Sequence, residues 1–579
     1  MFLPMTKSEM EARGWKELDV ILITGDAYID SPFSGVAVIG RVLEDAGYRV
    51  GIIACPDPKN DHDFQRLGEP RLFWGITAGA MDSMVANYTP LKKPRKQDDM
   101  LPAGKNTRPD RATIVYTNTI RRIFGKTAPI VLGGIEASLR RIIHYDYWDD
   151  DLRRSLLMDS KADFLIYGMG EKSVLELAEK LKKGEDPRTI RGLCYLSSQP
   201  PSDGVELPGW DEVKSDKLLF IQMFHEFYRE QDPIRGRRLF QRQTPHNDPP
   251  RYLVHNPPAF PLTQPELDHI YELPYEYDAH PIHHKQGPIR ALETIRFSIT
   301  THRGCYGECR FCAIAVHQGR QILSRSFESI VREARRLTAH PLFRGYIHDV
   351  GGPTANMWQM DCEKKTKTGA CPTRSCLFPS PCEQLSPSHN SQRKLLETLR
   401  HLPRVKAVFV SSGIRPDLVY ADPAGESYIK QIVFFHTSGQ LKLAPEHTEK
   451  PILALMGKPD LSSLLQFRRD FLRFSKQAGK KQFLTYYFIA AHPGCTLQDM
   501  QRAKDFIQKH LHLTPEQVQI FTPTPLTYAS VMYYTERDPF HPEKTIFVEK
   551  SPAGKQKQKD ILQEEKKSPS RLHKRPPKS

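Results

Sequence analysis

Residues 301–312 read Thr301-His-Arg-Gly-Cys305-Tyr-Gly-Glu-Cys309-Arg-Phe-Cys312 and set three cysteines in the spacing C-x3-C-x2-C. Three closely spaced thiolates with no fourth beside them can hold three irons of a cubane cluster and leave one iron open. An open coordination position is where a reactant binds, as in catalytic zinc sites. The spacing therefore predicts a 4Fe-4S cluster with one exchangeable position. A zinc knuckle with a fourth ligand nearby, and cysteines that only pack in a core, are the alternatives.

The same stretch resembles the signature of the radical S-adenosylmethionine (SAM) enzymes. In those enzymes the open iron binds the amino acid end of SAM, and reduction releases a 5′-deoxyadenosyl radical. The resemblance implies that Cys305, Cys309 and Cys312 are the cluster ligands and that SAM is the exchangeable one. It also implies that Phe311 lies near the adenine, because it stands where the family usually has an aromatic residue.

Apolar or β-branched runs separated by helical stretches recur in the second half of the chain. The six runs are residues 295–301, 345–350, 405–411, 440–444, 483–490 and 518–521. Alternating strands and helices are typical of a parallel sheet with right-handed crossovers. We therefore expect a partial (β/α)6 radical SAM barrel over residues 291–535.

Polar and glycine residues follow the expected strands, and in such barrels the reactive groups gather at the carboxyl ends of strands. Gly351 and Gly352 end the second strand. They resemble the glycine motif of the radical SAM enzymes, whose carbonyls meet the SAM amino group. Pro353 departs from that motif, because many members have glutamate at this position. Ser412 and Arg415 follow the third strand. Arg415 could pair in fork geometry with the SAM carboxylate, or it could be a surface arginine of a loop.

Glu446 and His447 follow the fourth expected strand. They could contact the SAM ribose or the substrate. They could equally form a satisfied polar pair in a loop. With Phe311 and the residues of the second and third strand ends, Glu446 completes the predicted cofactor-binding set.

The first 200 residues show a second α/β pattern. The expected strands are residues 19–24, 49–55, 112–117, 130–134 and 164–167, with a helix over 36–46. This open pattern is flavodoxin-like, and it resembles the cobalamin-binding domain that precedes the barrel in some radical SAM methylases. Those domains use an Asp-x-His-x-x-Gly loop, whereas residues 30–35 read Asp-Ser-Pro-Phe-Ser-Gly without histidine. Cobalamin bound through a histidine is therefore not expected; cobalamin bound without it, or no cobalamin, remain open.

Longer strings identify the chain as a member of the YgiQ family of radical SAM proteins, whose substrates are largely unknown. They are Phe-Leu-Pro at 2–4, Ala-Arg-Gly-Trp at 12–15, Gly-Asp-Ala-Tyr at 25–28, Leu-Gly-Gly-Ile-Glu-Ala-Ser at 132–138, Tyr-Gly-Met-Gly-Glu at 167–171, Asn-Pro-Pro at 256–258 and Tyr-Tyr-Thr at 533–535. The departures are Ser31, where the family often has histidine, and a shortened basic carboxyl end. The resemblance implies an electron donor such as flavodoxin or ferredoxin.

Length and composition indicate a cytoplasmic enzyme of at least two domains. We expect an α/β domain over 1–200, a connector rich in proline and histidine over 201–290, the barrel with an insertion over 360–385, and a disordered basic tail over 536–579. The chain has no apolar run of about 18 residues and no secretion signal at its start. Its ten cysteines therefore favour metal binding over disulfides.

Four of the remaining cysteines, Cys362, Cys371, Cys376 and Cys382, lie in the polar insertion. Four thiolates suit a structural zinc or an auxiliary iron-sulfur cluster, and a metal could order a segment with little to pack. Independent thiols or a transient disulfide are the alternatives. The solitary cysteines, which we expect to be packing residues, are Cys55, Cys194 and Cys495.

The net charge of +15 suggests a nucleic acid partner. Residues 551–579, however, hold nine Lys and Arg against three Asp and Glu, so they supply six of the fifteen charges and leave +9 for the rest. The basic stretch 235–238 is most simply a solvated loop, and His280, His283 and His284 have no metal-site pattern. The alternative function is a non-catalytic iron-sulfur or zinc protein that binds nucleic acid through its basic surface.

Overall fold

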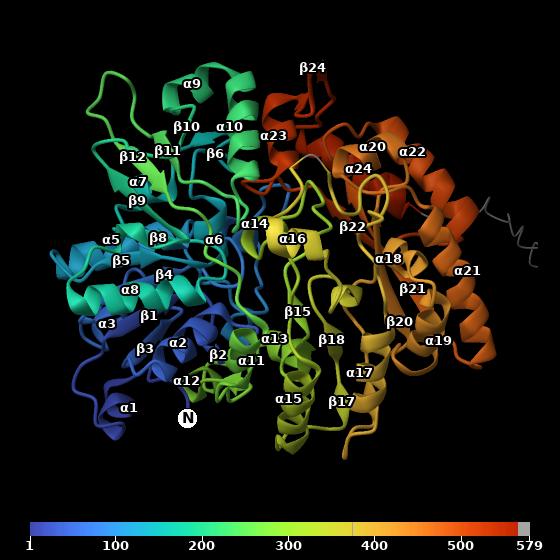
Figure 1. The fold of residues 1–579 in the computed structure, drawn as a ribbon, viewed down its shortest axis with the longest axis horizontal. Helices are drawn as coiled ribbons and strands as arrows, with labels where there is room; N and C mark the ends of the chain where they lie inside the picture. The colour runs from blue at the N-terminus through green and yellow to red at the C-terminus, as the bar shows by residue number, and fades with distance from the viewer. Residues whose placement is uncertain (373, 565–579) are drawn as a thin grey trace, which may run out of the picture.

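The computed structural model of the chain describes residues 1–372 and 374–564. Two α/β halves lie side by side, the N-terminal half in blue to green and the C-terminal half in yellow-green to red (Figure 1). No helix among these residues is long and apolar enough to span a membrane.

A nine-stranded sheet organises the N-terminal half. Its five parallel strands are β1 (Val20–Thr24), β3 (Val50–Ala54), β4 (Phe73–Thr77), β5 (Ile130–Leu132) and β8 (Phe164–Ile166). They run in the spatial order β3-β1-β4-β5-β8. Numbered among themselves, these strands have the order 2-1-3-4-5, which is that of flavodoxin-like sheets. Ligands bind such sheets outside the carboxyl ends of the strands, where the strand order reverses.

Helices cover both faces of this sheet, which explains why β1 is buried along its whole length. Val20 and Leu22 belong to one apolar core with helices α2 (Gly35–Asp45) and α8 (Glu171–Lys183). Ile21 and Ile23 point to the opposite core, which contains helix α5 (Ala112–Phe124). The other helices of this half include α1 (Lys7–Ala12), α3 (Asp61–Gln65), α4 (Ser83–Asn87), α6 (Gly134–Leu139), α7 (Leu156–Ser160), α9 (Trp210–Ser215), α10 (Lys217–Arg229) and α11 (Gln264–Glu272).

One strand prediction for this half is wrong, and one strand was missed. Residues 112–117, expected to be a strand, begin helix α5. Their β-branched composition is typical of a strand, but the buried positions Ala112, Tyr116 and Ile120 recur every four residues, which is a helical period. Strand β4 was not predicted, although it lies beside β1 at the centre of the sheet.

Residues 201–290 do more than connect two domains. Strands β9 (Leu193–Ser197), β10 (Val205–Leu207), β11 (Leu239–Arg242) and β12 (Tyr252–His255) extend the sheet beyond β8 in the order β8-β9-β12-β11-β10. Three of these four strands lie in the segment expected to be a connector, so part of this segment belongs to the N-terminal sheet.

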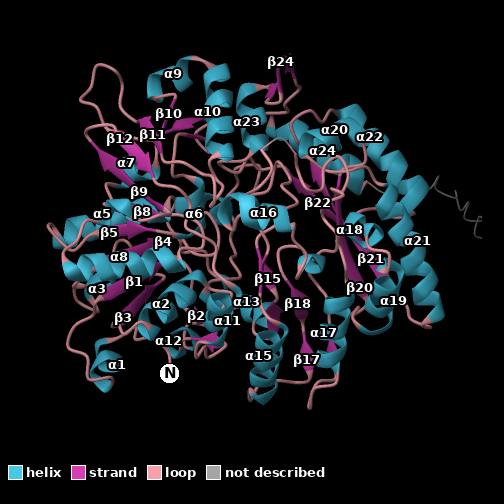
Figure 2. Ribbon diagram, in the orientation of Figure 1, coloured by secondary structure: helices cyan, strands magenta, loops and turns pink. Residues whose placement is uncertain are grey.

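Parallel strand pairs with helices between them form the C-terminal half (Figure 2). The strands are β14 (Ser298–Thr300), β17 (Tyr346–Ile347), β18 (Asp349–Gly351), β19 (Ala407–Val408), β20 (Gln440–Glu446), β21 (Phe483–Ala490) and β22 (Gln517–Ile520). The pairs β14 with β18, β17 with β19, β20 with β21, and β21 with β22 are all parallel. The intervening helices include α15 (Phe327–Ala339), α17 (Asn390–Arg400), α19 (Gly425–Phe435), α21 (Ser462–Gln477) and α22 (Leu497–Phe506).

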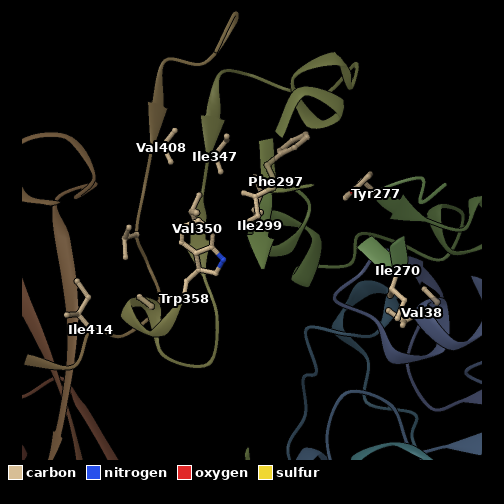
Figure 3. Packing of buried hydrophobic residues seen from close by; sticks show 14 of the residues in the cluster. Val38, Ile270, Tyr277, Phe297, Ile299, Ile347, Val350, Trp358, Val408 and Ile414 are labelled. Atoms are coloured by element: carbon tan, nitrogen blue, oxygen red, sulfur yellow. The ribbon is translucent and has the colours of Figure 1, made fainter. Parts of the chain in front are cut away.

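Each of the six expected strand runs contains at least one observed strand. The first is shorter than expected, because its start, Ile295, ends helix α13 (Ala291–Ile295). Side chains of successive strands, including Ile299, Val350 and Val408, pack into one apolar core (Figure 3). This core holds the carboxyl ends of the strands in fixed positions.

The carboxyl-terminal segment is ordered where it was expected to be disordered. Strands β23 (Arg537–Asp538) and β24 (His541–Thr545) precede helix α24 (Pro552–Gln563). The buried residues Lys555, Gln558 and Leu562 share one face of α24, and the Gln558 side chain bonds the backbone of the 491–495 loop. Residues 565–579 lie outside the described part of the chain.

Candidate functional site

The three clustered cysteines lie on the loop that follows the short strand β15 (His302–Arg303), just after β14, and neighbouring residues fix this loop at several points. The Cys305 amide donates to the Gly319 carbonyl (3.2 Å), and the Cys312 amide donates to the Cys309 carbonyl (2.9 Å). The Arg310 amide donates to the Met456 carbonyl (2.9 Å). All three cysteines are partly buried. The loop is therefore a built turn whose thiols do not lie in open solvent.

The surroundings of these thiols fit a 4Fe-4S cluster. The Gly307 amide donates to Cys305 Sγ (3.4 Å), and Arg415 Nη1 lies 3.8 Å from Cys309 Sγ. N–H groups directed at the sulfurs are a common way in which proteins stabilise and tune such clusters. A Cβ at Gly307 would lie 2.9 Å from Arg415 Nη1 and 3.2 Å from Cys305 Sγ, so only glycine leaves this space.

Within the described ranges, no three His, Cys, Asp or Glu side chains gather closely enough to hold a single metal ion. A cubane does not require such convergence, because each thiolate ligates a different iron.

Gly351 and Gly352 form an edge beside the cysteine loop. The Gly351 carbonyl accepts from the Thr301 amide (2.7 Å), which joins the ends of β18 and β14. A Cβ at Gly351 would lie 2.9 Å from Ser412 Oγ, and one at Gly352 would lie 2.6 Å from the ring of the fully buried His302. Both positions therefore require glycine for packing reasons, whether or not a ligand is bound.

Asp349 connects the second and third strand ends, and the sequence analysis did not identify it. One carboxylate oxygen accepts from the Ser411 and Ser412 amides (2.7 and 3.0 Å). The Ser412 hydroxyl donates to the other oxygen. This network places Ser412 against Gly351.

The guanidinium of Arg415 pairs with Asp417, with 2.6 Å between Nη2 and Oδ2. The remaining nitrogen, Nη1, points to Cys309. The fork face that we expected to be available for the SAM carboxylate is therefore occupied by Asp417 in this structure. The Asn356 side chain bonds both the amide (2.9 Å) and the carbonyl (3.1 Å) of Arg415 and so fixes its backbone.

Glu446 ends β20 with a φ of 68° and lies 3.7 Å from Lys458 Nζ. Burial raises the pKa of its carboxyl group, although Lys458 and Arg415 oppose this shift. His447 does not pair with Glu446; its Nε2 lies 3.4 Å from the sulfur of buried Cys495. Glu446 thus faces the cysteine loop, whereas His447 belongs to the packing beneath it.

Phe311 lies edge-on to the His492 ring, with 6.2 Å between the ring centroids. Its partly buried side chain contacts both apolar cores of the molecule. This position is next to Cys312 in the sequence and at the boundary between the two halves.

Three cysteines of the insertion lie close to the cysteine loop. Cys362, Cys376 and Cys382 are partly buried against the same small apolar cluster as Cys305. Cys371 is exposed. The insertion also contains helix α16 (Glu363–Thr368), and the Cys382 amide donates to the Cys376 carbonyl (2.9 Å).

The solitary cysteines and connector residues have structural surroundings. Cys194 and Cys495 are fully buried, as expected of packing residues, whereas Cys55 is only partly buried. His283 Nε2 accepts from the Tyr28 amide (3.0 Å). In the basic stretch, Arg237 pairs with Glu230, and Arg238 pairs with Asp203.

A cavity of about 470 Å³ lies between the two halves. On one side it is bordered by the carboxyl ends of β1, β4, β5 and β8, and on the other by Gly351, Gly352 and Ser412. The edge formed by Gly351, Gly352 and Ser412 therefore faces the carboxyl edge of the N-terminal sheet.

Comparisons with known proteins identify the family of the chain. A family model described as Radical SAM N-terminal matches residues 2–298. A UPF0313 protein of Fusobacterium nucleatum is 52% identical over 570 residues, covering 98% of this chain and 99% of the relative. A UPF0313 protein of Thermotoga maritima is 48% identical, covering 97% of this chain and 98% of the relative.

Among solved structures, the radical SAM methyltransferase TsrM from Kitasatospora setae, with cobalamin and a 4Fe-4S cluster bound, is similar at a TM-score of 0.48 and 15% identity. The match covers 88% of this chain and 74% of that one. The identity and coverage of the UPF0313 relatives are high enough to assign the family. The chain belongs to the UPF0313 or YgiQ family of radical SAM proteins.

Proposed function

We propose that this protein is a radical SAM enzyme that binds a 4Fe-4S cluster through Cys305, Cys309 and Cys312. The observation that carries the proposal is the juxtaposition of the cysteine loop with the second strand end: Thr354, two residues beyond Gly352, has its hydroxyl 3.8 Å from Cys305 Sγ. The loop and the glycine edge are therefore close enough for one ligand to contact both.

When bound, the cluster would supply SAM with one electron, received from a donor such as flavodoxin or ferredoxin. This electron would break the C5′–S bond of SAM to give methionine and a 5′-deoxyadenosyl radical. The radical would remove a hydrogen atom from the substrate to form 5′-deoxyadenosine. The protein orients the reactants and excludes water. Gly351 and Gly352 allow the SAM amino group to approach the backbone. Glu446 is the candidate partner of the ribose, and Phe311 of the adenine.

Arg415 takes a different role in this proposal from the one that the sequence suggested. Its ion pair with Asp417 holds the guanidinium so that one N–H points at Cys309. A positive group beside a cluster sulfur stabilises the more negative, reduced state. SAM carboxylate binding by Arg415 would require this ion pair to open or to be shared.

For the architecture we propose a flavodoxin-like domain followed by a partial (β/α)6 barrel. Cobalamin has no assigned role in this proposal. In the loop 30–35, Pro32 stands at the histidine position of the Asp-x-His-x-x-Gly motif, and Asp30 of the same loop forms a buried ion pair with Arg41.

We also retain a second metal on the insertion as a proposal. Three of its four thiols share a partly apolar environment next to Cys305, which is a suitable setting for an auxiliary cluster or a structural zinc. Metal binding by all four cysteines would require the exposed Cys371 side chain to turn inward. Otherwise the metal would be held by ligands that do not include Cys371.

Iron and sulfide analysis of anaerobically purified protein, with electron paramagnetic resonance (EPR) of the reduced form, tests the principal site. Cys305→Ala, Cys309→Ala and Cys312→Ala should each remove the cluster signal. Cys55→Ala is the matched control, because Cys55 is a partly buried cysteine outside both groups. Full retention of the signal in all three loop variants would refute the assignment.

A further inference from the structure

The cavity between the two halves has the size of a small-molecule site. Its volume of about 470 Å³ lies within the range of about 300–1,000 Å³ that ligand pockets occupy. It lies at the carboxyl edge of the N-terminal parallel sheet and includes the ends of β1 and β4, between which the strand order reverses. Both its size and its place in the fold indicate a binding site.

Most of the cavity wall is apolar. The apolar lining side chains from the sheet and from helices α2 and α8 include Leu22, Val36, Ile39, Phe73, Ile166 and Val174. Gly75, in the middle of β4, also lines it, and a glycine inside a central strand often marks close approach of another group. The body of the ligand should therefore be apolar.

One end of the cavity is suited to an anion. Helix α2 begins there at Gly35, its N-cap Ser34 makes no side-chain cap, and its first turn holds no acidic residue. In the part of the chain that the structure describes, the amides of Gly35, Val36 and Ala37 find no acceptor. Unsatisfied amides and the helix dipole together favour a negative group at this position.

Helix α8 provides a contrast at the same cavity. Its first residue is Glu171, which forms a buried ion pair with Arg303. The positive end of α8 is therefore already matched by a protein carboxylate, and α2 is the better site for a ligand anion.

A second polar group at the cavity lacks a partner. His302 lines it, is fully buried, and has no hydrogen-bond partner for Nε2 among the described residues. Its ring packs against Gly352, on the SAM side. A polar atom buried without a partner is costly, and a bound ligand could satisfy it.

We infer that this cavity holds the substrate, and that the substrate is a largely apolar small molecule with one anionic group. The anion binds the first turn of α2, and the apolar body lies toward Gly351, Gly352 and Ser412. Its identity as the substrate rests on the proposed function, because that function places SAM at this edge. The binding of an apolar anion to the cavity does not depend on SAM cleavage.

Two glycines allow the cavity to be filled without strained backbone. A Cβ at Gly35 would meet no atom within 4 Å, and one at Gly133 would meet only the Ile166 carbonyl, at 3.9 Å. Neither residue has a positive φ. Gly35→Leu and Gly133→Leu should therefore fold and project a side chain at the cavity from two different elements. The matched control is Ala424→Leu, at the start of α19 and outside the cavity lining.

The probe is 8-anilinonaphthalene-1-sulfonate, a fluorescent apolar anion, and its neutral analogue is N-phenyl-1-naphthylamine. We expect the full-length protein to bind one equivalent of the anion at least tenfold more tightly than the neutral analogue. Both leucine variants should weaken anion binding at least tenfold, with unchanged circular dichroism, whereas Ala424→Leu should bind like the parent.

Equal affinity for the two probes would overturn the anionic class of ligand, and unchanged binding in both glycine variants would overturn the site. Formation of 5′-deoxyadenosine by the parent protein is measured in parallel. Its absence, with the binding pattern intact, would count against the proposed function and not against the cavity as an anion site.

Discussion

Replacing Gly352 with alanine should weaken SAM binding, because the added Cβ has no room beside His302. An ideal Cβ at this position would lie 2.6 Å from Cε1, 2.7 Å from Nε2 and 2.8 Å from Nδ1 of the imidazole. His302 is fully buried, so its ring cannot move into solvent. The easier response is a shift of the edge formed by Gly351 and the partly buried Gly352, away from the cofactor.

Overpacking of this kind costs about 1–3 kcal/mol. If the edge moves and SAM must push it back, the whole cost is subtracted from the binding free energy. At about 1.4 kcal/mol for each tenfold change, SAM affinity should fall by between about fivefold and about 140-fold. Iron content should stay at the parent level, because Gly352 contributes no ligand.

The assay is a SAM titration of the anaerobically reconstituted protein, followed through the EPR spectrum of the reduced form. Gly413→Ala is the control, since a Cβ there meets nothing within 4 Å. A double variant with His302→Ala should recover affinity, because removing the ring gives the new methyl group space, and the two changes should be strongly coupled. Parent-like SAM affinity in Gly352→Ala would refute the reasoning.

Three further predictions follow from contacts outside the glycine edge. Removing Cys371 and Cys376 together should lower the total metal per chain, while the EPR signal that responds to SAM persists. Elemental analysis identifies the lost metal, and an unchanged metal content would contradict a second site. Asn356→Ala should lower the free energy of unfolding by about 1–3 kcal/mol, measured by urea denaturation, because it strips buried hydrogen bonds from the backbone of Arg415; a change within error would show that these bonds are dispensable. Burial lowers the pKa of Lys555 to about 8 from an ordinary value of 10.5. Between these two pH values, Lys555 is protonated in the unfolded chain but not in the native protein. The contribution of this group to the free energy of unfolding therefore rises with pH. Lys555→Met should remove that rise in a series of denaturant titrations, and an unchanged slope would exclude Lys555 as its source.

The sequence was most informative where function depends on local spacing. The three loop cysteines and the glycines that end the second strand are brought together by adjacent parallel strands, β14 and β18. Parallel strands align their carboxyl ends, so the expected order of strands was enough to predict this neighbourhood.

The partners of those residues could not be predicted, because they depend on side-chain packing. Asp417 lies two positions from Arg415, yet nothing in their spacing shows that it would occupy the fork face. Asp349 precedes the glycine edge and was read as part of a strand, although its carboxylate binds the backbone of the next strand end. To predict such contacts one must know the register between neighbouring strands, and amino-acid composition does not provide it.

Errors in secondary structure have a similar origin. The run over 112–117 was interpreted from its β-branched residues, while burial follows the helical spacing of α5. The basic composition of the tail concealed the few buried positions of α24, which attach it to the 491–495 loop. In both cases tertiary contacts decided between local preferences.

Formation of 5′-deoxyadenosine is the most direct test of the central claim that the loop cysteines support reductive cleavage of SAM. Anaerobically reconstituted protein is incubated with SAM and dithionite, and the product is quantified by mass spectrometry. We predict that the parent and Cys55→Ala produce 5′-deoxyadenosine, and that Cys305→Ala, Cys309→Ala and Cys312→Ala do not. If the parent protein carries a full complement of iron and sulfide but produces none, or if the loop variants produce as much as the parent, the claim is contradicted.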